Sequence, residues 1–286
     1  MFNKRVYFTA NILILLLAAV LFISSCLNSS EIIFNIDWQM VAVLIVTAII
    51  SHFLKALRLY LEFYEFNISK AVFTKQYCKV IPVSILLPFK SGDIFRAYSY
   101  GYAIGNYYAG FSVVLLDRFV DTVALIFVML IFSFSMGIHL TFVFYLLLTF
   151  LGLLALIYFR FPYMYRYWKK YLIKSKSSQR TIKHLRSIEN LKRAFDHVET
   201  VVRGKFLITF LISVCAWLVE IGGLVIYCQW TNQYDHLVVS DYLTGILSGN
   251  QHEYLTQFII LSVSIFAILY AAVSITLIIR RRKEKK

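Results

Sequence analysis

Residues 206–229 read FLITFLISVCAWLVEIGGLVIYCQ, an apolar run with a single charged side chain, that of Glu220. A helix rises 1.5 Å per residue, so about 20 residues cross the ~30 Å hydrocarbon core of a bilayer. The run does not alternate between apolar and polar side chains at every second position, as a strand of a membrane barrel would. We therefore expect a membrane-spanning helix here.

Five further runs have the same character, and they cover residues 8–27, 38–57, 117–136, 139–159 and 256–279. The chain is 60% hydrophobic and 15% charged, whereas an ordinary soluble domain carries about 25% charged residues. We therefore expect an all-α, polytopic helical membrane protein with six full spans. The length of the chain indicates a single membrane domain, residues 1–286.

The first run has a second interpretation. Lys4 and Arg5 before it and Cys26 near its end also fit a cleaved signal with a lipid-attachment cysteine. The run is long enough to span a bilayer, so we expect an uncleaved first helix.

Basic residues are unevenly distributed between the runs. Two lie at positions 4–5, the segment 160–205 holds thirteen against three acids, and the tail 280–286 holds six. The loops 28–37 and 231–255 contain no Lys or Arg. The positive-inside rule then places both termini and the 160–205 loop in the cytoplasm, with the protein integral to the cell (inner) membrane. The net charge of +14 fits contact with anionic lipid headgroups, and we expect no binding of nucleic acid.

The basic loop 160–205 contains an apolar periodicity. Side chains recur at spacings of three or four at Ile182, Leu185, Ile188, Leu191, Phe195, Val198 and Val202. This pattern predicts an amphipathic helix. Two placements remain open: on the inner leaflet, or packed on the protein's own cytoplasmic face.

The region 71–116 must cross the membrane an even number of times, because the chain is cytoplasmic before and after it. Either it crosses twice, as 71–88 and 98–116, or it enters and returns. The first half carries Lys75, Lys79 and Pro82, which make a poor span. We favour a re-entrant pair of half-helices, because broken helices offer free backbone groups and dipole charge that often build sites.

The proposed turn of this pair reads PFKSGDIFR, from Pro88 to Arg96. Pro88 would stop the first helix, Gly92 would permit a tight turn, and Asp93 would cap the second helix. Arg96 lies three residues beyond Asp93 and can pair with it. The stretch is therefore either an ordinary capped loop or a site.

A second charged cluster, Asp117-Arg118-Phe-Val-Asp121, opens the third predicted span. Charges within a membrane are costly unless they are paired or hydrated. The cluster either anchors its own helix through local ion pairs, or partners the charges of the preceding turn. In the second arrangement Lys90, Arg96 and Arg118 would face a lipid phosphate, whose oxygens suit the planar fork of arginine.

Two other charged residues lie at helix positions. Arg58 follows the second span and either anchors it at the inner leaflet or joins the site. Glu220 is a lone carboxylate in an apolar helix, which makes it a functional candidate that pairs with a cation or holds a proton. The neighbouring Gly222 and Gly223 permit close approach of another helix.

No catalytic set is evident. The six histidines are scattered, the four cysteines form no CxxC pair, and nucleotide, dinucleotide and metalloprotease fingerprints are absent from the sequence. We expect no metal and no cofactor, and the residues favour a protein that is not an enzyme.

The order of these motifs resembles the transmembrane region of lysylphosphatidylglycerol synthases and related flippase-like integral membrane proteins. The resemblance covers most of the chain, is strongest from 55 to 125, and rests on Arg58, Pro88-x-Lys90-x-Gly92-Asp93-x-x-Arg96, Asp117-Arg118-x-x-Asp121 and Trp217…Glu220. The chain departs from the family near its last helices, where a Gly/Pro-rich turn with a glutamate is replaced by the stretch 247–253, which keeps one Gly and the Glu.

The resemblance implies a protein that binds an aminoacyl-phosphatidylglycerol-like phospholipid, or a polyprenyl-linked headgroup, and translocates it between leaflets. The implied phosphate-binding residues are Lys90, Arg96, Arg118 and Arg58. The implied supporting residues are Pro88, Gly92, Asp93, Asp117, Asp121 and Glu220.

Two alternatives remain open. One is an accessory membrane subunit of envelope lipid or glycan synthesis, with a separate synthase as its partner. The other follows from the family label alone, a phosphatidylglycerol lysyltransferase. Full synthases carry a soluble domain that transfers the aminoacyl group, and we expect that domain to be missing because the sequence ends at Lys286.

Overall fold

The computed structural model describes residues 4–28, 38–66, 68–87, 91–136, 142–174, 179–231, 238–239, 241–243 and 253–283. Within these ranges the chain is helical apart from short turns and caps, and contains no strand. Five of the described helices are long and apolar enough to cross a membrane. The predicted all-α membrane architecture is therefore confirmed at this level.

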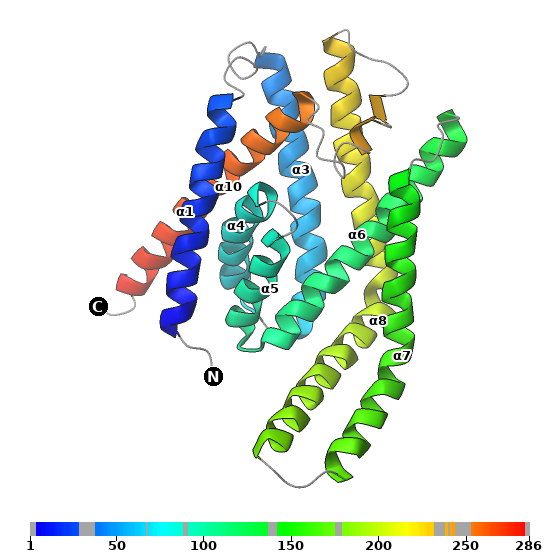
Figure 1. Cartoon of the computed structure of the whole chain (residues 1–286). Helices are drawn as coiled ribbons and strands as arrows, with labels where there is room; N and C mark the ends of the chain where they lie inside the picture. The colour runs from blue at the N-terminus through cyan, green and yellow to red at the C-terminus, as the bar shows by residue number, and fades with distance from the viewer. Residues whose placement is uncertain are drawn as a thin grey trace.

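The helices form one bundle with a long projecting hairpin (Figure 1). In chain order they are α1 (Lys4–Asn28), α3 (Trp38–Phe63), the 3₁₀ turn η1 (Tyr64–Phe66), α4 (Lys70–Leu86), α5 (Ser91–Ile104), α6 (Tyr107–Met136), α7 (Phe142–Lys174), α8 (Gln179–Trp230) and α10 (Glu253–Lys283). Each predicted span lies within one long helix, except that residues 139–141 fall outside the described ranges. The five candidate spans lie in α1, α3, α7, α8 and α10.

Helix α6 begins ten residues earlier than the span predicted at 117–136. Gly105 has a φ of 78° and breaks the chain after α5, a conformation that glycine adopts at little cost. The side chain of Asn106 then accepts hydrogen bonds from the backbone N–H groups of Tyr108 and Ala109 and so begins α6. The prediction that Asp117 opens a helix is therefore wrong, because the charged cluster lies inside α6.

Helices α4 and α5 are short and lie side by side between α1 and α6 (Figure 1). Their 17 and 14 residues extend about 26 and 21 Å, less than the ~30 Å hydrocarbon core. The break after Ile104 excludes a single crossing helix over 98–116. A pair of short helices in the region 71–116 is the geometry expected for a re-entrant segment. Lys79 of α4 is buried and donates to the Tyr7 hydroxyl at 3.0 Å and to Asn11 Oδ1 at 3.1 Å, which joins α4 to α1.

Two apolar clusters hold the bundle together. The first joins α3, α6, α8 and α10 around Leu44, Ala124, Leu224 and Tyr254. The second joins α3, α4 and α5 around residues such as Tyr100. Because lipid tails are themselves apolar, close packing and interhelical hydrogen bonds drive the association of membrane helices. The charged residues of interest lie where these helices meet.

The lower halves of α7 and α8 extend beyond the bundle as a hairpin (Figure 1). Their 33 and 52 residues give lengths of about 50 and 78 Å, which exceed a bilayer core. The periodic stretch 182–202 is the first part of α8, continuous with the apolar run that follows it. Its Phe195 packs on Tyr158 and Phe161 of α7. The start of α1 and the end of α10 lie toward the same side as the hairpin (Figure 1).

Candidate functional site

A polar stripe on α3 begins the site. Ser51, Lys55, Arg58 and Glu62 are three or four residues apart, so they lie on one face of the helix. Ser51, Arg58 and Glu62 are buried. This face is turned toward α6 and α8, which supply most of its partners.

Arg58 binds two aspartates of α6 and one serine of α8. Its Nε and Nη2 donate to Asp117 Oδ1 at 2.9 and 2.6 Å, and its Nη1 donates to Asp121 Oδ1 at 2.6 Å. Nη1 also donates to Ser213, whose hydroxyl in turn donates to Asp121 at 3.1 Å. The guanidinium therefore ties α3, α6 and α8 together at one point.

Arg96 and Arg118 continue the network onto α5. Arg96 Nη2 donates to Asp117 Oδ2 at 2.8 Å, and its Nη1 reaches Asp93 Oδ1 at 3.3 Å. Arg118 donates to the same Asp93 oxygen through Nε at 2.9 Å and Nη2 at 2.5 Å. Three arginines and three aspartates thus form one continuous ion-pair network with no net charge.

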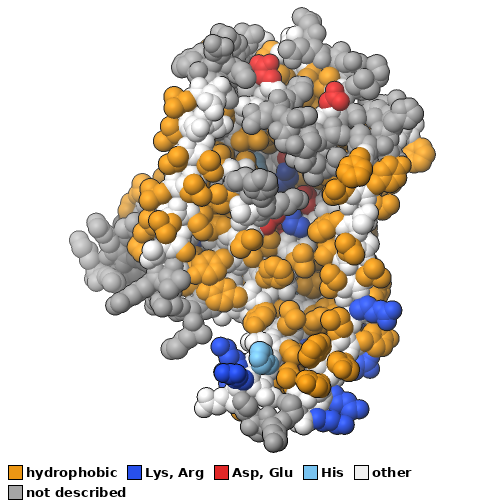
Figure 2. Space-filling model, viewed as in Figure 1, with side chains coloured by type: hydrophobic (Ala, Val, Ile, Leu, Met, Phe, Trp, Pro, Cys, Tyr) orange, Lys and Arg blue, Asp and Glu red, His pale blue; other side chains and the backbone are white. Residues whose placement is uncertain are grey.

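The network runs from a buried end to a partly exposed end. The side chains of Arg58 and Asp117 are 4% and 2% exposed, whereas those of Asp93 and Arg118 are 18% and 34% exposed. Figure 2 shows a few Lys or Arg and Asp or Glu side chains in a recess near the middle of the molecule, above a broad band of hydrophobic side chains. Arg118 Nη1 makes no hydrogen bond within the part of the chain that the structure describes. Arg118 is therefore the arginine of the network that an approaching charged group can reach before the two buried ones.

A second ion pair lies beside the network. Glu220 of α8 accepts from Lys55 Nζ at 2.5 Å and from the Ser51 hydroxyl. Lys55 also lies 5.5 Å from the ring centroid of Trp217, within cation–π range. The lone carboxylate of the apolar span therefore has a cationic partner on α3. Across the described residues, no group of three or more His, Cys, Asp or Glu side chains could hold a metal ion.

A comparison with protein families identifies the family of this membrane domain. The family model described as "Lysylphosphatidylglycerol synthase TM region" matches residues 8–246. The chain belongs to this family. No curated protein and no solved structure matches the chain significantly. The match includes all six residues of the ion-pair network, so the network lies inside the family's membrane domain.

The structure brings together six residues that the sequence analysis selected for the lysylphosphatidylglycerol synthase transmembrane-region site, namely Arg58, Asp93, Arg96, Asp117, Arg118 and Asp121. Glu220 lies in the adjacent pair. Pro88 and Lys90 fall outside the described residues. Leu87 before them has φ −76° and ψ 129°, the extended conformation favoured before proline.

Three details of the predicted site need correction. Asp93 lies in the first turn of α5, which begins at Ser91, so it is not a cap. Gly92 is helical, and its missing side chain leaves room for the backbone of Ser84 in α4 rather than for a turn. Of the two arrangements left open for the second cluster, the structure shows pairing with the preceding stretch, because Arg118 pairs with Asp93 and not with Asp121. The expected basic pocket is, among the described residues, a balanced network.

Sequence reasoning missed four members of the site. Ser51, Lys55 and Glu62 complete the polar stripe of α3, and Ser213 bridges Arg58 to Asp121. The sequence did contain a signal for this stripe, namely the spacing of Ser51, Lys55, Arg58 and Glu62. A helix face with four polar side chains at intervals of four, three and four residues indicates burial against other polar groups.

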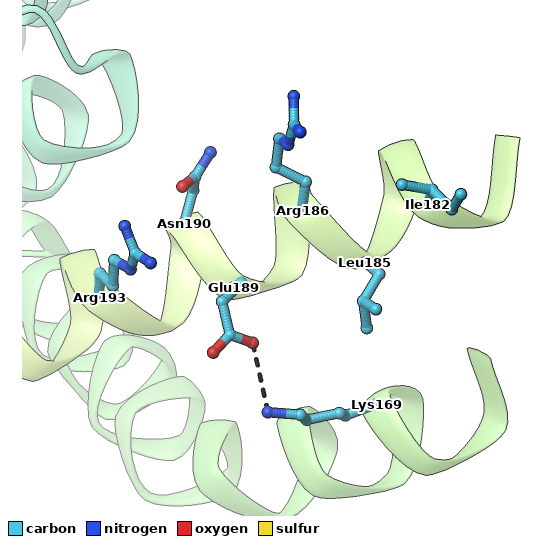
Figure 3. Close-up of a pocket in the computed structure, with 7 residues that line it drawn as sticks. All are labelled: Lys169, Ile182, Leu185, Arg186, Glu189, Asn190 and Arg193. Atoms are coloured by element: carbon cyan, nitrogen blue, oxygen red, sulfur yellow. Dashed lines mark hydrogen bonds and ion pairs between the residues drawn. The ribbon is translucent and has the colours of Figure 1, made fainter. Parts of the chain in front are cut away.

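The α7–α8 hairpin carries a separate open groove of about 460 Å³. It is lined by Lys169, Ile182, Leu185, Arg186, Glu189, Asn190 and Arg193. In Figure 3, Glu189 and Leu185 point toward α7, and Lys169 pairs with Glu189 at 3.4 Å. Arg186, Asn190 and Arg193 point away from α7. The outer surface of the hairpin is therefore strongly basic.

Proposed function

We propose that the protein binds an anionic lipid headgroup in the recess at Arg118 and moves it between the two leaflets. The lipid is an aminoacyl-phosphatidylglycerol-like phospholipid or a polyprenyl-linked headgroup. The observation that carries the proposal is a buried ion-pair network that opens at one end onto an apolar face. Such networks within a membrane domain are costly and characteristically mark a pathway for substrate. Membership of the lysylphosphatidylglycerol synthase transmembrane-region family supports a lipid as that substrate.

Arg118 is the phosphate-binding residue in this mechanism. Its side chain is the most exposed of the three arginines, and Asp93 is its only ion-pair partner among the described residues. A guanidinium can bind two phosphate oxygens at once. Arg58 and Arg96 are buried and ion-paired with aspartates, although Arg96 Nε has no hydrogen-bond partner among the described residues, so they position Asp117 and Asp93 instead.

Exchange of anions makes the binding reversible. A headgroup phosphate that reaches Arg118 replaces the carboxylate of Asp93, which can remain paired with Arg96. The two hydrogen bonds from Arg118 to Asp93 are lost as hydrogen bonds to the phosphate form, so the net free energy of headgroup binding stays small. A translocation pathway needs binding that is weak enough for the lipid to leave on the other side.

Leaflet exchange of a fluorescent lipid tests the proposal. The protein is reconstituted in vesicles with a headgroup-accessible fluorescent phosphatidylglycerol, and the fraction quenched by a membrane-impermeant reductant is followed over time. In vesicles that contain the wild type, the reductant should quench the fluorescent lipid of both leaflets. In protein-free vesicles it should quench only the lipid of the outer leaflet. Arg118→Gln should slow exchange at least tenfold, while Asp196→Asn, on the hairpin, should exchange at the wild-type rate. Equal rates in the wild type and Arg118→Gln would exclude this site.

The hairpin supports a second candidate, the accessory subunit of a separate lipid or glycan synthase. Its α7 half exposes aromatic side chains, among them Tyr163, Tyr167 and Trp168, beside the basic groove of α8. Aromatic and arginine side chains are enriched at protein interfaces. This function predicts that Arg186→Glu with Arg193→Glu abolishes co-purification of a synthase while leaflet exchange continues. Co-purification that survives both changes would exclude the groove as the docking surface.

A further inference from the structure

Glu62 is an unexplained carboxyl group at the buried end of the network. It lies in the last turn of α3, four residues after Arg58, and its side chain is 0% exposed. Neither carboxyl oxygen has a hydrogen-bond partner among the described residues. A buried, unpaired carboxylate is among the most costly groups a membrane protein can hold. The carboxyl group of Glu62 is therefore expected to be protonated and neutral.

The charges around Glu62 agree with this expectation. They come from Arg58 on its own helix, Arg96 of α5, and Asp117 and Asp121 of α6. His197 of α8 lies 3.1 Å from the backbone carbonyl oxygen of Glu62, through Nε2. The three arginines and three aspartates already balance, so an ionised Glu62 would give the buried cluster a net charge of −1. A proton on Glu62 removes that imbalance.

We propose that Glu62 is the proton-binding site that couples lipid translocation to the pH gradient across the membrane. The inference rests on the proposed function, and it identifies the proton as the ion that drives lipid translocation. In the conformation described here Glu62 holds its proton, and Arg58 binds Asp117 and Asp121. When Glu62 releases the proton, its carboxylate competes for Arg58, four residues away on the same helix face.

The α6 carboxylates are the proposed acceptors of that proton, and reaching them takes a rearrangement, because Glu62 has no hydrogen-bond partner among the described residues. Glu62 is fully buried, Asp117 nearly so, and Asp121 is 17% exposed. The O–H bond of Glu62 breaks, a carboxylate of α6 accepts the proton, and water at the recess then receives it. Arg58 moves from the protonated aspartate to the Glu62 carboxylate. When water takes the proton the aspartate is ionised again, so the network carries one net negative charge until a proton returns to Glu62. Because Arg58 ties α3 to α6 and α8, this exchange loosens the contact that separates the recess from the bundle interior.

Infrared spectroscopy of the purified protein tests the protonation directly and needs no transport. At neutral pH the wild type should show the carbonyl stretch of a protonated carboxylic acid. That band should disappear in Glu62→Gln and persist in Glu220→Gln, because Glu220 is ion-paired with Lys55. A spectrum in which Glu62→Gln removes no such band would overturn the proposal.

Leaflet exchange under a pH gradient tests the coupling. If one proton crosses per lipid, a gradient of one pH unit should shift the steady-state distribution of fluorescent phosphatidylglycerol about tenfold. The shift should vanish in Glu62→Gln, return in Glu62→Asp, and persist in Asp196→Asn. A wild type that exchanges lipid without responding to the gradient overturns the coupling, as does a Glu62→Gln variant that still responds. A wild type that exchanges no lipid overturns the proposed function itself, and the infrared band still decides whether Glu62 holds the proton.

Discussion

Replacement of Asp117 by asparagine tests how far the bundle depends on its ion-pair network. Asp117 accepts from Arg58 Nε at 2.9 Å and Nη2 at 2.6 Å, and from Arg96 Nη2 at 2.8 Å. Asparagine keeps the size of the side chain and removes its charge. Asp117→Asn therefore leaves three buried or partly buried arginines with two aspartates.

The expected loss of stability follows from the burial of this pair. Removal of one partner of a buried salt bridge costs about 3–5 kcal/mol, because the other charge stays buried without compensation. Arg58 keeps Asp121, and Arg96 keeps Asp93. We therefore expect the lower end of that range for Asp117→Asn, about 3 kcal/mol.

The free energy of unfolding can be measured in mixed micelles by titration with a denaturing detergent, followed by circular dichroism. Asp196→Asn is the matched control, because it removes the same charge from an ion pair with Lys192 in which Asp196 is 51% exposed. Exposed pairs contribute less than about 1 kcal/mol. If Asp117→Asn destabilises the protein no more than Asp196→Asn does, the network does not hold the helices together.

Three further predictions concern neighbouring positions and use the same unfolding assay. A Cβ on Gly223 would lie 2.5 Å from Thr47 Oγ1, whereas one on Gly222 would meet nothing within 4 Å. Gly223→Ala should therefore lower the free energy of unfolding by about 1–3 kcal/mol, whereas Gly222→Ala should not lower it measurably. Equal effects of the two substitutions would contradict the close packing of Gly223 on Thr47. Glu220→Gln should cost about 1.5–3 kcal/mol through loss of its charge-assisted hydrogen bonds, and an unchanged stability would contradict the ion pair. Glu62→Gln should change the free energy of unfolding by less than about 1 kcal/mol, because one neutral group replaces another; a loss as large as that of Asp117→Asn would mean that Glu62 is ionised.

The sequence predicted the long helices well because their signal is local. An apolar run near 20 residues has few alternatives to a membrane helix, and each predicted run lies within one helix of the structure where it is described. The start of α6 was missed because the residues before Asp117 were assigned to a separate segment, 98–116, or to the re-entrant pair. Asn106 caps that helix and Gly105 separates it from α5, so one turn, not the general composition, fixes the boundary.

The members of the site could be predicted, but only part of their pairing: Arg96 with Asp93 follows from local spacing, whereas the partners of Arg58 do not. Charges inside apolar sequence are conspicuous, and six of the selected residues do meet. The Arg58–Asp117 pair joins residues 59 positions apart, and no local spacing indicates it. Local spacing left open whether Arg118 pairs within its own helix or with the preceding turn, and the structure pairs it with Asp93. Glu62 was overlooked because charges near a helix end usually serve as anchors at the membrane surface.

The most direct test of the account locates the headgroup. A phosphatidylglycerol with a photoreactive group on its glycerol headgroup is added to the reconstituted protein, irradiated, and the cross-linked peptides are identified by mass spectrometry. The account predicts adducts in the first turn of α5 and around Arg118 of α6, reduced in Arg118→Gln. Adducts confined to the exposed apolar faces of α1 and α7, with none at the recess, would contradict it.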